Sequence, residues 1–415
     1  MNKNFTFKIS LIVILVVLIL VAFLLRKNEE VLTPEKKPVI KEEFETKIIN
    51  KVHSSENYMI SPLSIAYALS ILKEGASDNT KLEIEKVLGD YKFTKINNVK
   101  DRINIANALF IKNDFTTNEE YINKIKNEYN ADTIYDEFKT PDKMNAWVKE
   151  KTYNMIDKIT EELTPEFRFG IANAIAIDVE WKNKFECYRT NKEEFTLKNG
   201  SKMEAAFMHS SNDVSYFENK DAKGIVKDYA IYNYETGEIE YKPSDKTIEL
   251  EYIAILPKDI DKYVSKFNKN VLKDIKNNLQ SPSEKLDINL SLPKYTYDYT
   301  YENFKNDLIS LGMKDAFDNE KASFKNISNE FLYVNEAIHK SHIELSENGT
   351  KAAALTAFLM DTNSAFEPEK KIIDIKFNKP FIYIIKEKNN DNIWFFGEVY
   401  NPMKFEDNKD TCEVR

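Results

Sequence analysis

Residues 57–76 read NYMISPLSIAYALSILKEGA, and the fold can be reasoned outward from this stretch. Ser61 and Pro62 stand directly before apolar residues at helical spacing. A serine side chain satisfies the first free N–H groups of a helix, and proline is favoured at the first helical position because its missing N–H is not needed there. Gly75 suits the end of the same helix. The stretch therefore predicts a helix that begins directly after Ser61.

Beyond this helix the chain changes from helical to extended patterns. Residues 102–111 have the pattern of a strand, and residues 142–164 that of an amphipathic helix. After residue 170 strand patterns dominate, namely IANAIAIDVEW (171–181), IELEYIAILP (248–257), DINLSLPKY (287–295), FLYVNEAI (331–338), KIIDIKF (371–377) and PFIYIIKE (380–387). Helices first and strands afterwards, without regular alternation, indicate an α+β fold. Residues 227–248 predict an exposed hairpin that turns at Thr236-Gly237.

Composition excludes several classes of function. The 415 residues carry 59 Lys and Arg against 68 Asp and Glu, a net charge of −9, which argues against nucleic acid as a partner. An apolar fraction of 42% is ample for a folded core. Only two cysteines and four histidines leave little material for a disulfide scaffold, a metal centre or a proton relay. We therefore expect no metal and no cofactor. Length alone predicts two or three domains, or one unusually large one.

The N-terminus carries a compartment signal. Residues 9–25 read ISLIVILVVLILVAFLL, a run without charge that is preceded by Lys3 and Lys8 and followed by Arg26-Lys27. At about 1.5 Å per residue, the run is near the short end of what spans a hydrocarbon core. No small-x-small cleavage site follows it, so we expect an uncleaved, single-pass signal anchor. A cleaved signal peptide is the alternative.

Residues 347–371, ENGTKAAALTAFLMDTNSAFEPEKK, form the segment that looks functional. They lie between two strand-like runs, and loops longer than about 12–15 residues inside compact domains are usually functional or disordered. On a strand, small residues at Thr350, Ala352, Ala354 and Thr356 would share one face, so the segment could slide between two other strands. A short alanine-rich helix in a surface loop is the alternative, and the residues alone leave both open.

A set of short motifs resembles the serpins, a family of serine protease inhibitors, and specifically bacterial-type, membrane-anchored members. The motifs occur in family order over roughly residues 44–403, and the ordered set is highly specific although each motif alone is weak. They are Asn57–Ile65 with Ala68-Leu69 and Gly75-Ala76, Ala106–Phe110, Asn145–Val148 with Thr152, Asn173–Ile175 with Trp181, Leu256-Pro257, Leu292–Lys294, Leu311–Met313, Ile338–Lys340, Glu347–Thr350, Phe377–Phe381, and Phe396-Gly397 with Asn401-Pro402.

The resemblance implies one large α+β domain with three β-sheets, about nine helices and an exposed reactive-centre loop. The predicted parts are then a cytoplasmic tail (1–8), a transmembrane signal anchor (9–25), a tether (26–43), the serpin domain (44–405) with its reactive loop (347–371), and a polar tail (406–415). This single domain replaces the two or three predicted from length. It would lie outside the cell membrane, or in the extracellular space if the anchor is cleaved.

In inhibitory serpins the loop is bait: a protease cleaves it as an acyl-enzyme, and the freed strand inserts into the main sheet and traps the enzyme. The hinge of such a loop must enter the sheet without hindrance. The matching hinge residues here are Glu347, Gly349, Thr350, Ala352, Ala353, Ala354 and Thr356. Asn348, Lys351 and Leu355 depart from the family pattern, but Lys351 and Leu355 would face outward after insertion.

The family's spacing, counted sixteen residues on from Glu347, places the reactive bond at Asn363-Ser364. The loop beyond is long, so Met360 or Phe366 could be the bait instead. Asn363 would suit an asparagine-preferring enzyme such as a cysteine protease, whereas Met360 or Phe366 would suit an elastase- or chymotrypsin-like serine protease.

The resemblance also assigns residues that hold the sheet closed. Ser61, Ser64, Asn173 and His339 match the family's shutter, where buried hydrogen bonds join the strands. Trp181 matches the breach, where the loop first enters. None of these is a catalytic residue.

Two other functions are alternatives to protease inhibition. An enzyme would pair a serine with His339 or His342, but no nucleophile elbow or HExxH motif is present. A non-inhibitory serpin acting as a surface binding or structural module is the closer rival, because of Lys351 and the 227–248 insertion. The expected partners are therefore a serine or cysteine protease and, through the N-terminal helix, the membrane. We expect a monomer, no nucleic acid and no cofactor.

Overall fold

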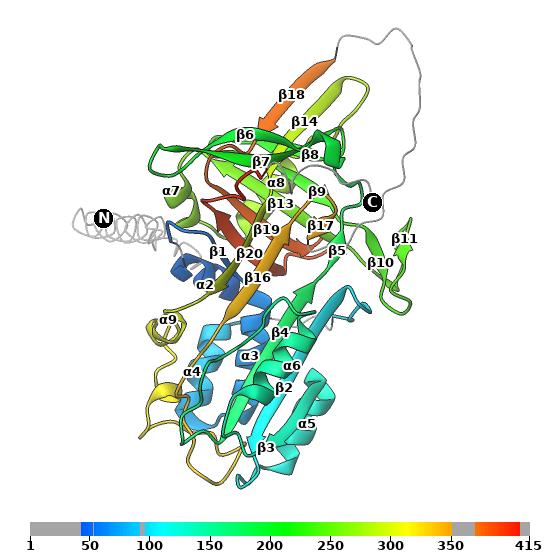
Figure 1. Ribbon diagram of the computed structural model, residues 1–415. Coiled ribbons are helices and arrows are strands. Elements are labelled where there is room, and N and C mark those ends of the chain that lie inside the picture. The colour runs from blue at the N-terminus through cyan, green and yellow to red at the C-terminus, as the bar shows by residue number, and fades with distance from the viewer. Residues whose placement is uncertain (1–42, 53, 92–95, 351–369, 407–415) are drawn as a thin grey trace, which may run out of the picture. The chain divides into compact units, whose positions relative to one another are not determined.

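The computed structural model describes residues 43–52, 54–91, 96–350 and 370–406, and all statements below concern these residues. They form eight α-helices and twenty strands (Figure 1). None of these helices is long and apolar enough to cross a membrane. The anchor predicted at residues 9–25 lies outside the described residues, as does the polar tail from residue 407 onward.

The main sheet is built from two hydrogen-bonded groups that share one continuous strand. The first group has the order β3-β2-β4 and the second β15-β16-β17-β5. Because β4 runs through Asp178 directly into β5, the two groups form one layer, as Figure 1 shows. The strands are β2 (Ile103–Lys112), β3 (Ala131–Asp136), β4 (Phe169–Ile177), β5 (Val179–Glu180), β15 (Tyr295–Thr300), β16 (Lys340–Leu345) and β17 (Gly349–Thr350).

Two further large sheets carry the rest of the strand patterns. A six-stranded sheet has the order β1 (Tyr58–Ile60), β20 (Ile393–Val399), β19 (Phe381–Glu387), β13 (Leu250–Pro257), β9 (Ala222–Asp228) and β8 (Ser215–Glu218). A four-stranded sheet has the order β18 (Lys371–Lys376), β14 (Leu286–Pro293), β7 (Lys202–Ser211) and β6 (Asn191–Thr196). The α+β class and the three predicted sheets are confirmed.

The predicted hairpin forms a small fourth sheet. It consists of β10 (Ile231–Asn233), β11 (Ile239–Glu240) and β12 (Thr247–Ile248), with β10 in the middle. Gly237 has a φ of +79°, a backbone conformation that favours glycine, so the turn falls where the sequence predicts it. The pairing and the turn are as predicted, but the hairpin is not exposed throughout, because Ile231 and Tyr232 are buried and residues 227–228 belong to β9.

The described helices are eight in number, and in three of them a side chain caps the first turn. They are α2 (Phe44–Val52), α3 (Pro62–Gly75), α4 (Asp78–Leu88), α5 (Glu119–Tyr129), α6 (Asp142–Lys151), α7 (Ile260–Val264), α8 (Asn270–Asn277) and α9 (Phe304–Ser310), with short 3₁₀ turns η1 (Cys187–Arg189) and η2 (Asp315–Phe317). The Ser61 hydroxyl accepts a hydrogen bond from the Ser64 N–H at 3.1 Å, and Pro62 opens α3. The prediction for residues 61–75 is confirmed, and α3 packs against β4 and β20.

Two predictions were wrong. The helix predicted over 142–164 ends at Lys151, because Tyr153 and Asn154 adopt positive φ values of 52° and 61° that no helix continues through. The strand predicted over 331–338 does not form: the described chain is irregular there, and Phe331 and Tyr333 are exposed at 58% and 42%. Leu332, Val334 and Ala337 still pack against the core, but no described strand pairs with this stretch to support the extended pattern.

Gly224 of β9 tests the packing between strands of the six-stranded sheet. A Cβ at this position would lie 2.1 Å from the Ala254 carbonyl oxygen and 2.5 Å from the Phe217 ring. We expect Gly224→Ala to lower the free energy of unfolding by about 1–3 kcal/mol, because neither neighbouring strand can give way. Gly170→Ala is the control, since its new Cβ would meet side chains alone, the Phe167 ring at 3.2 Å and the Met144 methyl group at 3.7 Å. Equal urea midpoints for the two variants would contradict this account.

Candidate functional site

The first residues of the predicted loop already lie inside the main sheet. Gly349 pairs with Glu180, and Thr350 pairs with Val179 on one side and with Leu345 on the other. The chain leaves β16, turns at Ser346, and enters between β16 and β5 as β17 (Figure 1). A Cβ on Gly349 would lie 2.0 Å from the Val179 carbonyl oxygen, which explains the glycine at this entrance.

Two aromatic side chains fix Thr350 in its position between β16 and β5, which we call the seat of β17. Thr350 is only 3% exposed, and its hydroxyl is 2.6 Å from the Tyr229 hydroxyl. The Tyr229 ring stacks on Trp181 with ring centroids 4.5 Å apart. Burial raises the pKa of Tyr229 well above its ordinary value, so the hydroxyl stays protonated and available for this hydrogen bond.

Trp181 and the residues after it hold the backbone of the turn. The Trp181 indole N–H donates to the Ser346 carbonyl at 3.0 Å, and its backbone N–H donates to the Asn348 carbonyl at 2.8 Å. The Phe185 N–H donates to the Glu347 carbonyl at 2.9 Å. The structure thus brings the predicted breach residue into direct contact with the predicted hinge.

The Glu347 side chain is fixed at the same place. Its carboxylate accepts a hydrogen bond from the Thr190 hydroxyl at 2.7 Å and lies 3.4 Å from the Lys294 ammonium. Both partners come from outside the main sheet, Thr190 before β6 and Lys294 between β14 and β15. The hinge is therefore anchored on its N-terminal side, so movement of the loop must begin beyond Glu347.

The predicted shutter residues are brought together only in part. The Ser61 backbone N–H donates to His339 Nε2 at 3.0 Å, and Ser64 bonds to the Ser61 hydroxyl. Asn173 bonds elsewhere: its amide donates to the Asn107 side-chain oxygen at 2.8 Å. Its own Oδ1 is buried without a hydrogen-bond partner among the described residues. No hydrogen bond in the described part of the chain joins Asn173 to His339.

One edge of β4 is open toward β16. Among the described residues β4 pairs with β2 alone, and β16 pairs only with β15 and β17. Directly beyond Thr350, a narrow cavity is lined by residues that include Ile175, Ile177 and Ile343. Unpaired backbone N–H and C=O groups on such an edge are a template for a further strand. Among the described residues, the edge of β4 that faces β16 is therefore left without a partner strand.

The remaining predicted loop residues lie outside the described residues. These are the hinge residues Ala352, Ala353, Ala354 and Thr356, the reactive bond Asn363-Ser364, and the alternative bait residues Met360 and Phe366. The choice between strand and helix beyond Thr350 falls there too.

Sequence reasoning gave no role to Tyr229, Thr190 or Lys294, although Lys294 lies in one of the motifs. Tyr229 meets Trp181 through an isolated bridge between distant parts of the chain, so only the strand register reveals it. Thr190 and Lys294 reach Glu347 by tertiary packing that no spacing encodes. Cys187, at the start of η1 close to Thr190, is disulfide-bonded, and the only other cysteine of the sequence, Cys412, lies outside the described residues.

Comparisons with known proteins agree with this arrangement. The family model described as Serpin (serine protease inhibitor) matches residues 41–402. An uncharacterized serpin-like protein of Methanosarcina mazei is 30% identical over 370 residues, which cover 84% of this chain and 82% of that protein.

Solved structures agree as well. The crystal structure of tengpin, a thermophilic serpin, in its native state has a TM-score of 0.73 at 30% identity, covering 86% of this chain and 92% of tengpin. The latent state of tengpin has a TM-score of 0.69 at 28% identity, covering 88% and 97%. The chain belongs to the serpin family, whose description is that of inhibitors of serine proteases.

His339 predicts a pH dependence of stability. Its side chain is fully enclosed, and burial lowers its pKa from 6.5 to about 4. Between these values the unfolded chain binds the extra proton, so this contribution is complete above pH 6.5 and is lost as the pH falls toward 4. Between pH 7 and pH 4.5 we expect the wild-type chain to lose about 2–3 kcal/mol more unfolding free energy than His339→Gln. Glutamine can still accept the Ser61 N–H but does not titrate. Parallel pH curves from urea unfolding would contradict the assignment.

Proposed function

We propose that this protein is an inhibitor that traps a protease as a suicide substrate. The observation that carries the proposal is the seat of β17 between β5 and β16, above an edge of β4 that no described strand covers. A loop that has already entered at its first two residues needs no new opening at the top of the sheet. The small residues that follow in the sequence would fit the space between β4 and β16.

The reaction proposed begins as ordinary proteolysis. The nucleophile of the target attacks the carbonyl carbon of Asn363, the bond to the Ser364 nitrogen breaks, and the new amine leaves with the proton taken up by the target's base. The acyl-enzyme then joins the target to Asn363. The freed segment continues β17 along the edge of β4, and trapping requires that this insertion outrun hydrolysis of the acyl bond.

In this proposal the chain supplies the sheet edge for insertion and no catalytic group. His339 accepts a backbone N–H and is buried, and His342 is bound to Asp298 at 2.7 Å. Neither imidazole is hydrogen-bonded to a serine hydroxyl in the described part of the chain. The third described histidine, His209, lies 3.1 Å from the Ser291 hydroxyl and 2.7 Å from Glu193, on the sheet formed by β6, β7 and β14. No nucleophile elbow or HExxH motif accompanies it in the sequence, and we propose that the chain is not itself an enzyme.

The place of action proposed is outside the cell membrane. The support is the uncharged run at 9–25 and the polar tether that follows it. The protein would act as a monomer held by this anchor, or as a secreted inhibitor if the run is removed as a signal peptide.

A surface binding module is the second candidate. One observation favours it: the β10–β11 hairpin ends in Tyr241, which is 96% exposed, beside Ile239 at 47%. Large exposed apolar groups on an insertion are typical of contact surfaces. A protein of this kind would lose its loop to proteases without trapping them.

The direct test mixes the full chain with asparagine-specific, chymotrypsin-like and elastase-like proteases. We expect an SDS-resistant covalent complex with one of them and a released C-terminal peptide that begins at Ser364. A peptide beginning at Asp361 or Glu367 would move the reactive bond to Met360 or Phe366 and leave inhibition intact. Cleavage by every protease without a covalent band, and without a rise in melting temperature of the cleaved chain, would overturn the inhibitor function.

Thr350→Arg tests whether insertion through the seat of β17 is required. The seat is buried between two strands and under Tyr229, so a long cation there would have to lose its hydration to enter. We expect the covalent complex to fall at least about ten-fold while cleavage of the loop persists. Thr350→Ser, which keeps the hydroxyl and the small size, should trap the protease as the unchanged chain does. Equal trapping by the arginine variant would show that insertion does not pass through this seat.

A further inference from the structure

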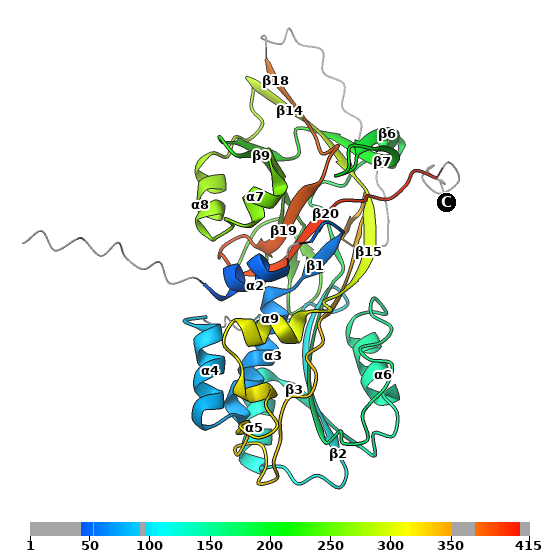
Figure 2. The same cartoon turned by 90° about the vertical axis from the view of Figure 1, so that its left-hand side faces the viewer.

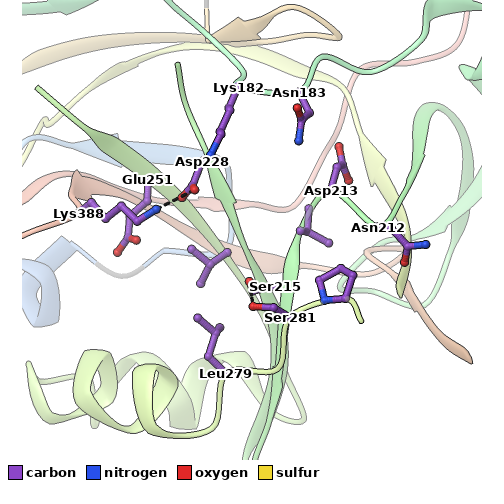
Figure 3. Close-up of a pocket in the computed structure, with 13 residues that line it drawn as sticks. Lys182, Asn183, Asn212, Asp213, Ser215, Asp228, Glu251, Leu279, Ser281 and Lys388 are labelled. Carbon is purple, nitrogen blue, oxygen red and sulfur yellow. Dashed lines mark hydrogen bonds and ion pairs between the residues drawn. The ribbon is translucent and has the colours of Figure 1, made fainter. Parts of the chain in front are cut away.

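A second concave site lies beside the hinge, on the other side of the segment that holds it. It is a cavity of about 400 Å³, walled by the chain after β5, the turn between β7 and β8, the outward face of β9 and the residues after α8 (Figure 3). Its lining includes Lys182 and Asn183, directly after Trp181. The protease-trapping function uses none of its side chains.

The negative charges of this cavity are already neutralised. Asp228 is paired with Lys388 at 2.7 Å, and Glu251 with Lys386 at 2.8 Å. Asp213 is paired with Lys227, a lysine whose side chain is only 1% exposed and whose ammonium lies 4.6 Å from the centre of the Phe185 ring. Each carboxylate therefore has a lysine of its own, and a cationic ligand would have to displace one.

One positively charged side chain of the lining is not used to neutralise a carboxylate. Within the described residues, the Lys182 ammonium has no ion-pair partner, and the neighbouring Asn183 amide forms no side-chain hydrogen bond. Figure 3 shows Lys182 and Asn183 at one end of the cavity and Leu279 at the opposite end. Val214, Val226 and Pro282 add apolar surface to the lining. The cavity thus has an apolar wall and a hydrogen-bonding end, where Asp213 and Asp228 also lie but are each paired with another lysine, so that Lys182 is the charge not balanced there.

We infer that this cavity binds a small organic anion with an apolar body. A carboxylate or sulfonate head would accept hydrogen bonds from the Lys182 ammonium and the Asn183 amide, and the body would lie against Leu279 and Val226. Charge-assisted hydrogen bonds orient the head, and removal of the apolar portion from water adds affinity.

Binding of a ligand in the cavity would affect the hinge, because the segment 181–185 contacts both. The Lys182 N–H donates to the Asp228 carbonyl at 3.0 Å, on the cavity wall. On either side of it, the N–H groups of Trp181 and Phe185 hold the carbonyls of Asn348 and Glu347. A ligand that fixes Lys182 therefore restrains the two hinge-holding amides, whether or not a protease is ever trapped.

The test uses the full chain and 8-anilinonaphthalene-1-sulfonate, with uncharged N-phenyl-1-naphthylamine as the matched probe. We expect saturable binding of the sulfonate that Lys182→Gln weakens about ten-fold, the loss of one charged hydrogen bond. Lys126→Gln, an exposed lysine of α5, is the control and should leave affinity unchanged. The uncharged probe should bind all three chains alike. It therefore also serves as the control for dye bound by the apolar run at 9–25.

Hydrogen exchange supplies a second readout. The sulfonate should slow exchange in a peptide covering residues 181–185 of the unchanged chain, and not in Ser281→Trp, where the new ring would occupy the cavity. Ser281 is exposed, so this variant should melt as the unchanged chain does. Equal sulfonate affinity in Lys182→Gln and Lys126→Gln, or no protection of residues 181–185, would overturn the inference. Because no protease is present, these outcomes are independent of whether the protein is an inhibitor.

Discussion

The structure depends on one unfilled place in its main sheet. β4 and β16 run side by side without hydrogen bonds between them among the described residues, and β17 fills only the top of the space with Gly349 and Thr350. Unpaired backbone groups at a sheet edge are unfavourable when they are enclosed and become favourable once another strand bonds to them. In the inhibitor function that we propose, the segment after β17 would bond to this edge and remove that unfavourable free energy.

On this proposal, small interactions would decide how readily the segment inserts. A backbone hydrogen bond contributes about 0.5–1.5 kcal/mol net, so several residues added along β4 would outweigh any single contact that opposes them. The contacts at the entrance act instead on the path. Tyr229 binds the first inserted side chain, and Trp181 and Phe185 fix the turn before it. Lys294 and Thr190 hold Glu347. The described part of the hinge is thus fixed in position, and the proposed insertion would start from it.

The sequence predicted the parts of this arrangement that local chemistry determines. The serine cap and proline located α3, the Thr-Gly turn located the hairpin, and the motifs located Trp181 and the Gly349-Thr350 entrance. It could not predict what depends on strand register or on tertiary partners. The apolar run at 331–338 has a strand's composition but no strand to pair with, and Asn173 bonds to Asn107 instead of joining His339. The contact of Tyr229 with Thr350 required three distant strands to be placed first.

The hinge and the second cavity are two faces of one short segment, and this explains an otherwise unfavourable feature. Lys227 is buried beside the Phe185 ring, and burial lowers its pKa although Asp213 opposes the shift. Removing such a pair from water costs several kcal/mol per ion before the attraction is counted, so stability alone does not account for it. The pair does fix a position: Asp213 belongs to the wall of the cavity, and the Lys227 ammonium lies under Trp181 and Phe185, which hold the hinge. Since protein interiors are close-packed, a shift of residues 181–185 on one face must displace what they contact on the other. The segment therefore links the geometry of the cavity to the geometry of the strand entrance.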